Sequence, residues 1–204
     1  MRFFIKPVLW TVLLTWVPFS AWAQSPSETV KRGNAEVERL LKEKADVEVL
    51  STTLEKFLDF GELAKRALGE KWKTLSKQQQ TAFEETMRGL LKATYVQKTA
   101  GGGASNLSNA QVEREELNAA EASVHATLQS GKTRIPIEYR LYKKQTSWRV
   151  FDIVTDEVSL VQTYEEQFRK FLATRSPEEL LKTLKAKREQ LEQAAKTTPE
   201  GVLK

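Results

Sequence analysis

Residues 124–155, VHATLQSGKTRIPIEYRLYKKQTSWRVFDIVT, decide the fold of this chain. Apolar and polar side chains alternate along three segments, 124–129, 134–141 and 148–155, which the short turn sequences SGK and QTS separate. A period of two is typical of half-buried β-strands, and connections this short require antiparallel pairing. The pattern therefore predicts three strands of a meander. Pro136 has no N–H to donate, so we expect an edge or a bulge at that position.

Helical periodicity surrounds this sheet. A fourth, weaker strand is expected over 111–117, whereas apolar side chains recur at helical spacing over 25–99 and again over 160–191. In the first helical region, Asp59 is a good N-cap and Gly69 a good helix stop, and they enclose an amphipathic segment. The order of helices, sheet and helices predicts an α+β domain, with helices packed on one face of a curved four-stranded antiparallel sheet.

The first 23 residues have the features of a secretory signal peptide. Arg2 and Lys6 supply positive charge, 8–17 is an apolar run, and Ala21-Trp22-Ala23 is a small-x-small cleavage site. The alternative is an uncleaved membrane anchor, but the run is only about half of the ~20 residues that a membrane span needs.

Cleavage at this site would begin the mature chain at Gln24. We therefore expect a cleaved signal peptide over 1–23, a single folded domain over 24–195 and a frayed tail over 196–204. Arg2 and Lys6 leave with the signal, so part of the formal net charge of +5 leaves too, and a nucleic-acid partner is not expected.

Composition argues mildly against an enzyme. The chain has 204 residues, 29% of them charged, with no cysteine and one histidine. A disulfide scaffold, a thiolate metal site and a cysteine nucleophile are therefore excluded, and no cofactor or metal is expected. The sequence also contains neither GxxxxGK[ST] nor GxGxxG, the common nucleotide-binding loops.

Two residues are the strongest candidates for chemistry. His125 lies between Ser123 and Thr127 on one strand face, but no GxSxG elbow accompanies it, so a surface histidine is the better interpretation. Asp152 shares its alternation with Val150 and Val154, and a carboxylate there is either a base with a raised pKa or a structural acceptor at a turn or helix start. We favour the structural role, because no second acid or metal ligand accompanies it.

Many large apolar side chains converge on the space between helices and sheet. Periodicity alone does not distinguish a filled core from an apolar cavity there, because both need the same inward-facing residues. The candidate residues are Phe60, Leu63, Met87, Leu90, Leu91, Tyr95, Ile137, Tyr139, Leu141, Tyr164, Phe168 and Phe171.

Two ordered blocks give the chain a family resemblance. The first is DFGELAKRALGEKWKTLSKQQ over 59–79, and the second combines IPIEYRL over 135–141, WRVFDIV over 148–154 and VSLVQTYEEQF over 158–168. Together they resemble the MlaC family, also called the toluene-tolerance ABC transporter auxiliary proteins. Glu157 stands where that family usually has glycine, the residue that most easily forms a left-handed turn.

The resemblance implies a nuclear transport factor 2-like fold with acyl chains held in an apolar cavity between helices and sheet. It also implies a non-enzymatic periplasmic phospholipid carrier that helps maintain outer-membrane lipid asymmetry. The implied partners are glycerophospholipid, an inner-membrane MCE-domain protein of an ABC transporter and an outer-membrane lipoprotein/porin complex. A hopanoid-associated branch of the family leaves the lipid class open.

Two other functions stay open at this point. One is a small-molecule enzyme of isomerase or dehydratase type on the same fold, using Asp152, Tyr139 or His125 as acid or base. The other is a periplasmic adaptor whose core is filled and binds no lipid.

Overall fold

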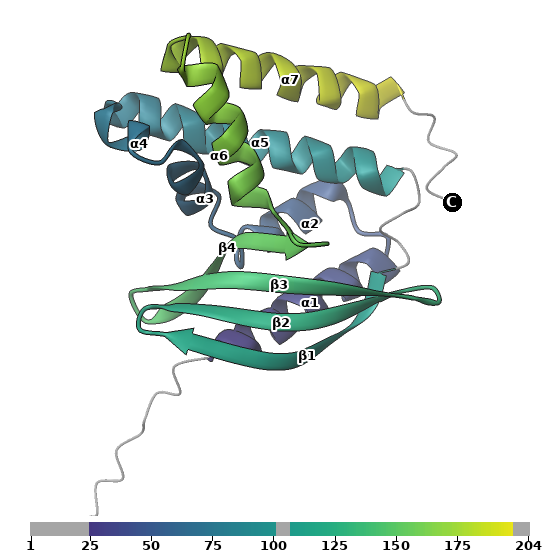
Figure 1. Ribbon diagram of the computed structural model, residues 1–204. Helices are drawn as coiled ribbons and strands as arrows, with labels where there is room; N and C mark the ends of the chain where they lie inside the picture. The colour runs from purple at the N-terminus through teal and green to yellow at the C-terminus, as the bar shows by residue number, and fades with distance from the viewer. Residues whose placement is uncertain (1–24, 101–106, 198–204) are drawn as a thin grey trace, which may run out of the picture.

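The computed structural model describes residues 25–100 and 107–197, so the expected signal peptide lies outside the described residues. Helices and strands follow the expected order of helices, sheet and helices (Figure 1). The elements are α1 (Pro26–Lys42), α2 (Val47–Leu54), α3 (Phe60–Leu68), α4 (Lys71–Thr74), α5 (Lys77–Ala100), β1 (Leu107–Asn118), β2 (Glu121–Ser130), β3 (Thr133–Lys144), β4 (Ser147–Thr155), β5 (Val158–Ser159), α6 (Leu160–Leu172) and α7 (Pro177–Thr197).

The sheet is an antiparallel meander in the order β1-β2-β3-β4-β5, which confirms the predicted α+β class. The short β5 adds a fifth strand that periodicity did not predict, because two residues are too few to show alternation. Pro136 pairs with Thr127 of β2 but lies beyond the last pair between β3 and β4, so the expected edge position is confirmed.

Helix α1 crosses one face of the sheet and packs on β1, β2 and β4 (Figure 1). Helices α3 and α6 meet the sheet mainly at β4, and α5 and α7 lie side by side in a further layer beyond them. Helix boundaries follow local capping. The Asp59 carboxylate accepts a hydrogen bond from the Glu62 amide at the start of α3, and Gly69 ends that helix with φ of 54°, as predicted.

A β-bulge in β4 changes which residues share a face. Arg140 pairs with Asp152 and Leu141 pairs with Val150, so Phe151 is the extra residue on β4. The expectation that Asp152 and Val150 share a face is therefore wrong. The bulge inverts the alternation after Val150, and Asp152 lies on the opposite side of the sheet.

The turn between β4 and β5 takes the left-handed conformation that the sequence left unpredicted. Asp156 and Glu157 have φ of 49° and 64° and connect the paired residues Thr155 and Val158. A two-residue hairpin loop with two positive φ angles matches the twist of its strands. The chain thus makes this turn without glycine, at a conformational cost.

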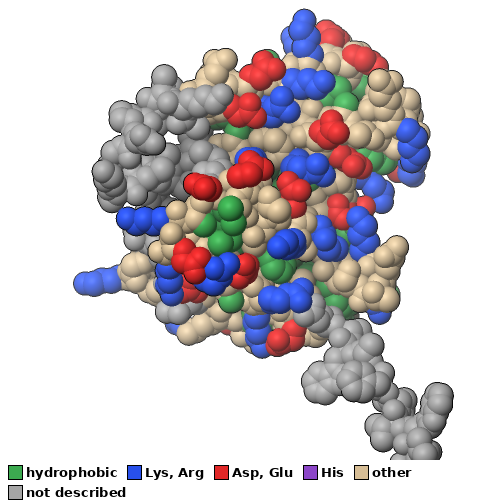
Figure 2. All heavy atoms as spheres, turned by 180° about the vertical axis from the view of Figure 1, so that it is seen from behind, with side chains coloured by type: hydrophobic (Ala, Val, Ile, Leu, Met, Phe, Trp, Pro, Cys, Tyr) green, Lys and Arg blue, Asp and Glu red, His purple; other side chains and the backbone are tan. Residues whose placement is uncertain are grey.

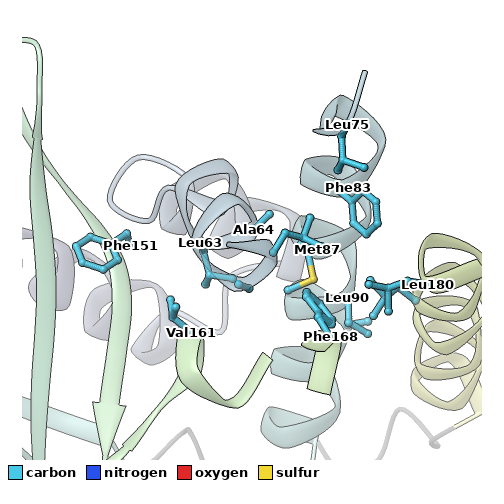
Figure 3. Close-up of a cluster of buried hydrophobic side chains, with 14 of the residues drawn as sticks. Leu63, Ala64, Leu75, Phe83, Met87, Leu90, Phe151, Val161, Phe168 and Leu180 are labelled. Carbon is cyan, nitrogen blue, oxygen red and sulfur yellow. The ribbon is translucent and has the colours of Figure 1, made fainter. Parts of the chain in front are cut away.

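Two apolar clusters form the interior. The helical core lies among α3, α5, α6 and α7, where Met87 of α5 and Phe168 of α6 lie close together (Figure 3). Its members are Leu63, Ala64, Ala67, Leu68, Leu75, Phe83, Met87, Leu90, Ala93, Phe151, Val161, Phe168, Leu180, Leu184 and Leu191. The sheet core lies between α1 and the strands, and its members are Val30, Ala122, Val124, Ala126, Tyr139, Leu141, Trp148 and Val150.

Candidate functional site

An apolar cavity of about 320 Å³ lies where the two cores meet. Its walls come from α1 and α2, from the segment that leads into α3 and the start of α3, from α5 and the start of α6, and from strands β2 to β4. The side chains around it are Thr29, Val30, Gly33, Asn34, Val37, Ser51, Leu54, Phe57, Leu58, Asp59, Phe60, Leu63, Leu91, Lys92, Leu128, Tyr139, Val150, Phe151, Asp152, Ile153 and Leu160.

Helix α1 supplies one continuous face of this wall. Val30, Gly33, Asn34 and Val37 follow the i, i+3, i+4, i+7 spacing that places residues on one side of a helix. Gly33 allows the aromatic ring of Phe57 to lie against the helix, since a Cβ at Gly33 would come within 3.0 Å of that ring. The glycine that weakens helix propensity in this segment therefore shapes the cavity wall.

A tyrosine–asparagine pair is one uncharged polar contact of the wall. The Tyr139 hydroxyl donates to Oδ1 of Asn34 at 2.8 Å and so joins β3 to α1. Burial raises the pKa of Tyr139 to about 12, although the hydrogen bond to Asn34 opposes this shift. The hydroxyl therefore stays protonated at neutral pH and acts as a hydrogen-bond donor rather than as a base.

Asp59 is a charged member of the wall whose oxygens are occupied elsewhere. Its carboxylate accepts hydrogen bonds from the Tyr142 hydroxyl at 2.6 Å, from Lys144 at 2.8 Å and from the Glu62 amide at 3.1 Å. Burial acts to raise the pKa of Asp59, but these hydrogen bonds outweigh it and lower the pKa to about 2. The carboxylate stays ionised and caps α3.

Asp152 has the structural role that the sequence favoured. Its carboxylate accepts from Ser159 Oγ at 2.6 Å, from the Val161 amide at 3.0 Å and from Arg140 at 3.3 Å. Ser159 in turn caps α6 by accepting from the Gln162 amide. Asp152 therefore fastens the start of α6 to β4, and its oxygens have three donors already.

The surroundings of His125 do not form a catalytic triad. Its ring contacts Arg114 at 3.2 Å on β1, while the Ser123 hydroxyl donates to Glu138 at 2.8 Å instead of approaching the imidazole. Among residues 25–100 and 107–197, no group of three or more histidine or acidic side chains is placed to hold a metal ion.

The structure brings some of the candidate residues to the cavity and places others behind its walls. Phe60, Leu63, Leu91 and Tyr139 line it. The remaining candidates pack in or against the two cores, and the side chain of one lies outside the described part of α5. The helical core contains Met87, Leu90 and Phe168, and Tyr164 and Phe171 pack against it. The sheet core contains Leu141, and Ile137 packs against it. The side chain that lies outside the described residues is that of Tyr95.

Sequence reasoning missed the contribution of α1, α2 and the segment after α2. The apolar spacing of Val30 and Val37 indicates a buried helix face, but it does not show what that face covers. Asn34 and Gly33 carry no apolar signal, and Phe57 and Leu58 lie in an irregular segment without periodicity. Only the packing of α1 across the sheet brings these residues together.

On the face shown in Figure 2, basic and acidic side chains are interspersed with small apolar areas. In the described part of the chain, no helix is both long enough and apolar enough to cross a bilayer.

Fold and cavity together define an α+β protein that encloses an apolar space between a curved antiparallel sheet and its covering helices. The chain belongs to the MlaC family, whose model matches residues 27–186. This is a family of non-enzymatic lipid carriers, which sets aside the enzymatic alternative built on Asp152, Tyr139 and His125.

A solved structure has the same fold. It is a phospholipid-binding protein from Ralstonia solanacearum, determined in complex with a phospholipid. The two structures agree with a TM-score of 0.69 and 22% sequence identity, over 80% of this chain and 97% of that chain. The comparison with curated proteins gave no match.

Proposed function

We propose that this protein is a periplasmic phospholipid carrier. It moves glycerophospholipid between the outer membrane and an inner-membrane MCE-type ABC transporter, and so helps maintain outer-membrane lipid asymmetry. The observation that carries the proposal is the apolar cavity of about 320 Å³ in a chain of the MlaC family. The phospholipid bound by the Ralstonia protein, which shares this fold, supports the same cargo here.

The cavity wall suits alkyl chains. Each methylene removed from water contributes about 0.8 kcal/mol, so an apolar wall can offset the cost of taking a lipid out of a bilayer. The charged lining residues Asp59, Asp152 and Lys92 are paired with protein groups. The headgroup stays at the surface, because a charge placed in an apolar cavity is costly.

The cavity volume limits how much lipid fits without movement. The volume of about 320 Å³ lies at the lower end of the roughly 300–1,000 Å³ that small-molecule sites occupy. A phospholipid with two acyl chains is large for a site of this size, so we expect the walls to separate when it binds. Phe60, Leu63, Leu91 and Tyr139 would contact the chains first, and the other candidate residues would form the layer behind them.

The proposed location rests on residues 1–23, which lie outside the described residues. Cleavage after Ala23 would release a lipid-binding domain over 24–195 into the periplasm. Intact-mass analysis of periplasmic protein should give a chain that begins at Gln24. Retention of Trp10 and Trp16 would indicate a tethered protein and contradict a shuttle.

Transfer between membranes tests the function directly. Protein loaded with a labelled phospholipid is mixed with proteoliposomes that contain the MCE-type ABC transporter of the same bacterium, or with plain liposomes as a control. We expect faster transfer of label to the transporter-containing vesicles. Equal rates for both kinds of vesicle would remove the transporter partner from the proposal, and failure to load any phospholipid would favour the adaptor alternative.

A further inference from the structure

Lys92 is the only cation among the described residues that line the cavity. It follows Leu91, another lining residue of α5, and its side chain is 32% exposed. A lysine in such a position lays its aliphatic stem along an apolar wall and keeps its ammonium group in water. Lys92 therefore stands at the rim, where the apolar cavity meets solvent.

The ammonium group of Lys92 is held by a carboxylate from another wall of the cavity. It forms an ion pair with Glu48 on α2, whose side chain is 77% exposed. Glu48 precedes Ser51, a buried lining residue, by one helical turn, so its carboxylate also stands at the rim. Exposed ion pairs contribute little to stability, so another anion can replace this carboxylate without a large loss.

The two carboxylates of the cavity wall have cations of their own. Asp59 pairs with Lys144 at 2.8 Å, and Asp152 pairs with Arg140 at 3.3 Å. Neither carboxylate is paired with Lys92. The described part of the wall thus presents no unpaired negative charge that would repel an anion bound at the rim.

We infer that Lys92 binds the phosphodiester group of the bound lipid in place of Glu48, an inference that rests on the proposed function. Desolvation keeps a phosphate out of an apolar cavity, and a single glycerol unit joins it to the acyl chains, so it lies at the rim. A hydrogen bond between an ammonium group and a phosphate is charge-assisted and stronger than a neutral one. The exchange also removes an ion pair between α2 and α5, two walls of the cavity.

A competition between a phospholipid and a diacylglycerol tests this assignment. Vesicles contain equal amounts of phosphatidylglycerol and of diacylglycerol with the same acyl chains, and mass spectrometry of lipid extracted from the re-isolated protein gives the ratio taken up. Lys92→Gln should lower the ratio of phospholipid to diacylglycerol about fivefold, because a charge-assisted hydrogen bond is lost. Glu48→Gln should raise the ratio about twofold, because the competing carboxylate is gone.

Two further proteins separate phosphate binding from a structural role. Lys92→Gln combined with Glu48→Gln should give the ratio of Lys92→Gln alone, since Glu48 acts only through Lys92. If the ion pair merely fastened α2 to α5, both single substitutions would change the ratio in the same direction. Arg88→Gln is the matched control, because Arg88 of α5 pairs with Glu55 at the end of α2 but does not line the cavity, and it should keep the wild-type ratio.

Inorganic phosphate distinguishes a lipid headgroup from a free anion. An excess of it should leave the wild-type ratio unchanged, because a phosphate attached to chains in the cavity has a high effective concentration at Lys92. Loss of the preference in inorganic phosphate would overturn the assignment to a headgroup, and so would a wild-type ratio in folded Lys92→Gln. Both results leave the carrier function standing, whereas uptake of neither lipid by the wild-type protein contradicts the inference and the carrier function together.

Discussion

The Asp152 carboxylate joins three separate parts of the chain. It accepts from Arg140 on β3, from Ser159 at the end of β5 and from the Val161 amide in α6, and its side chain is 1% exposed. Removal of a buried acceptor leaves its donors without partners, which is more costly than the loss of a surface contact. Asp152 therefore contributes to holding the start of α6 against the sheet.

Asp152→Ala should therefore lower the free energy of unfolding by about 3 kcal/mol. Urea denaturation followed by far-UV circular dichroism measures the change. Glu166→Ala on the exposed side of α6 is the matched control and should change stability by less than about 0.5 kcal/mol. Equal effects of the two substitutions would show that the Asp152 network does not hold α6 in place.

Ionisation of the Asp59 carboxylate makes the stability of the protein depend on pH in the acid range. Its pKa is about 2 in the folded chain, against an ordinary value of 3.8. A lowered carboxyl pKa stabilises the fold fully above the unfolded value, and this contribution is lost as the pH falls through the folded value. We expect about 2 kcal/mol from Asp59 at neutral pH, declining between about pH 4 and pH 2.

Urea denaturation of the wild-type protein and of Asp59→Asn at several pH values isolates this contribution. The difference in stability between the two proteins should shrink steadily as the pH is lowered from 4 to 2. A difference that is the same at pH 7 and pH 2 would mean that ionisation of Asp59 does not stabilise the fold.

Glu157 offers a stabilising substitution. Its φ of 64° places its Cβ in a strained position, and glycine takes this conformation without that strain. Glu157→Gly should raise the free energy of unfolding by about 1 kcal/mol, as measured by thermal or urea denaturation. Glu157→Ala also removes the charge but keeps the Cβ, so it should give no such increase. Equal stability of the two variants would argue against backbone strain at this turn.

At the scale of elements, periodicity predicted the strands and most helices but not their mutual arrangement. The alternation in 134–141 and the cap and stop at Asp59 and Gly69 are local signals, and the structure confirms what they indicated. The bulge at Phe151 has no such local signal, because it arises from the register in which β4 pairs with β3. Alternation read from the sequence therefore placed Asp152 on the wrong face.

For a similar reason, the sequence predicted only some of the residues that line the cavity. Leu91 and Phe168 both lie on apolar stripes of helices, and their stripes look equivalent in the sequence. In the structure Leu91 lines the cavity, whereas Phe168 is 2% exposed in the helical core. Which of them faces open space depends on where α1 and α2 cover the sheet, and this follows from long-range packing that periodicity does not record.

Two positions on α1 distinguish the cavity from a packed core. Val37 is partly buried and lines the cavity, and Leu40, one turn later, is 4% exposed and does not line it. Val37→Glu should leave a cooperatively folded protein that takes up no phospholipid, because the carboxylate can be hydrated in an open cavity but opposes alkyl chains. Leu40→Glu should lose several kcal/mol of stability, since its charge has no access to water.

Circular dichroism, thermal denaturation and uptake from phospholipid vesicles give the comparison. The same substitution at Leu141 or Phe168, which lie in the packed cores, should behave like Leu40→Glu. Normal lipid uptake by folded Val37→Glu would show that chains do not enter this cavity. Unfolding of Val37→Glu to the same degree as Leu40→Glu would show that the space is effectively part of the core.

For the whole molecule, the central claim is that the domain carries a phospholipid between α1 and the sheet. Native mass spectrometry of protein purified from the periplasm without detergent tests it most directly. We expect a species heavier than the mature chain by the mass of one phospholipid, and removal of that lipid by organic extraction should restore the mass of the protein alone. A protein-only mass from the periplasm, together with no uptake after incubation with phospholipid vesicles, would contradict the account.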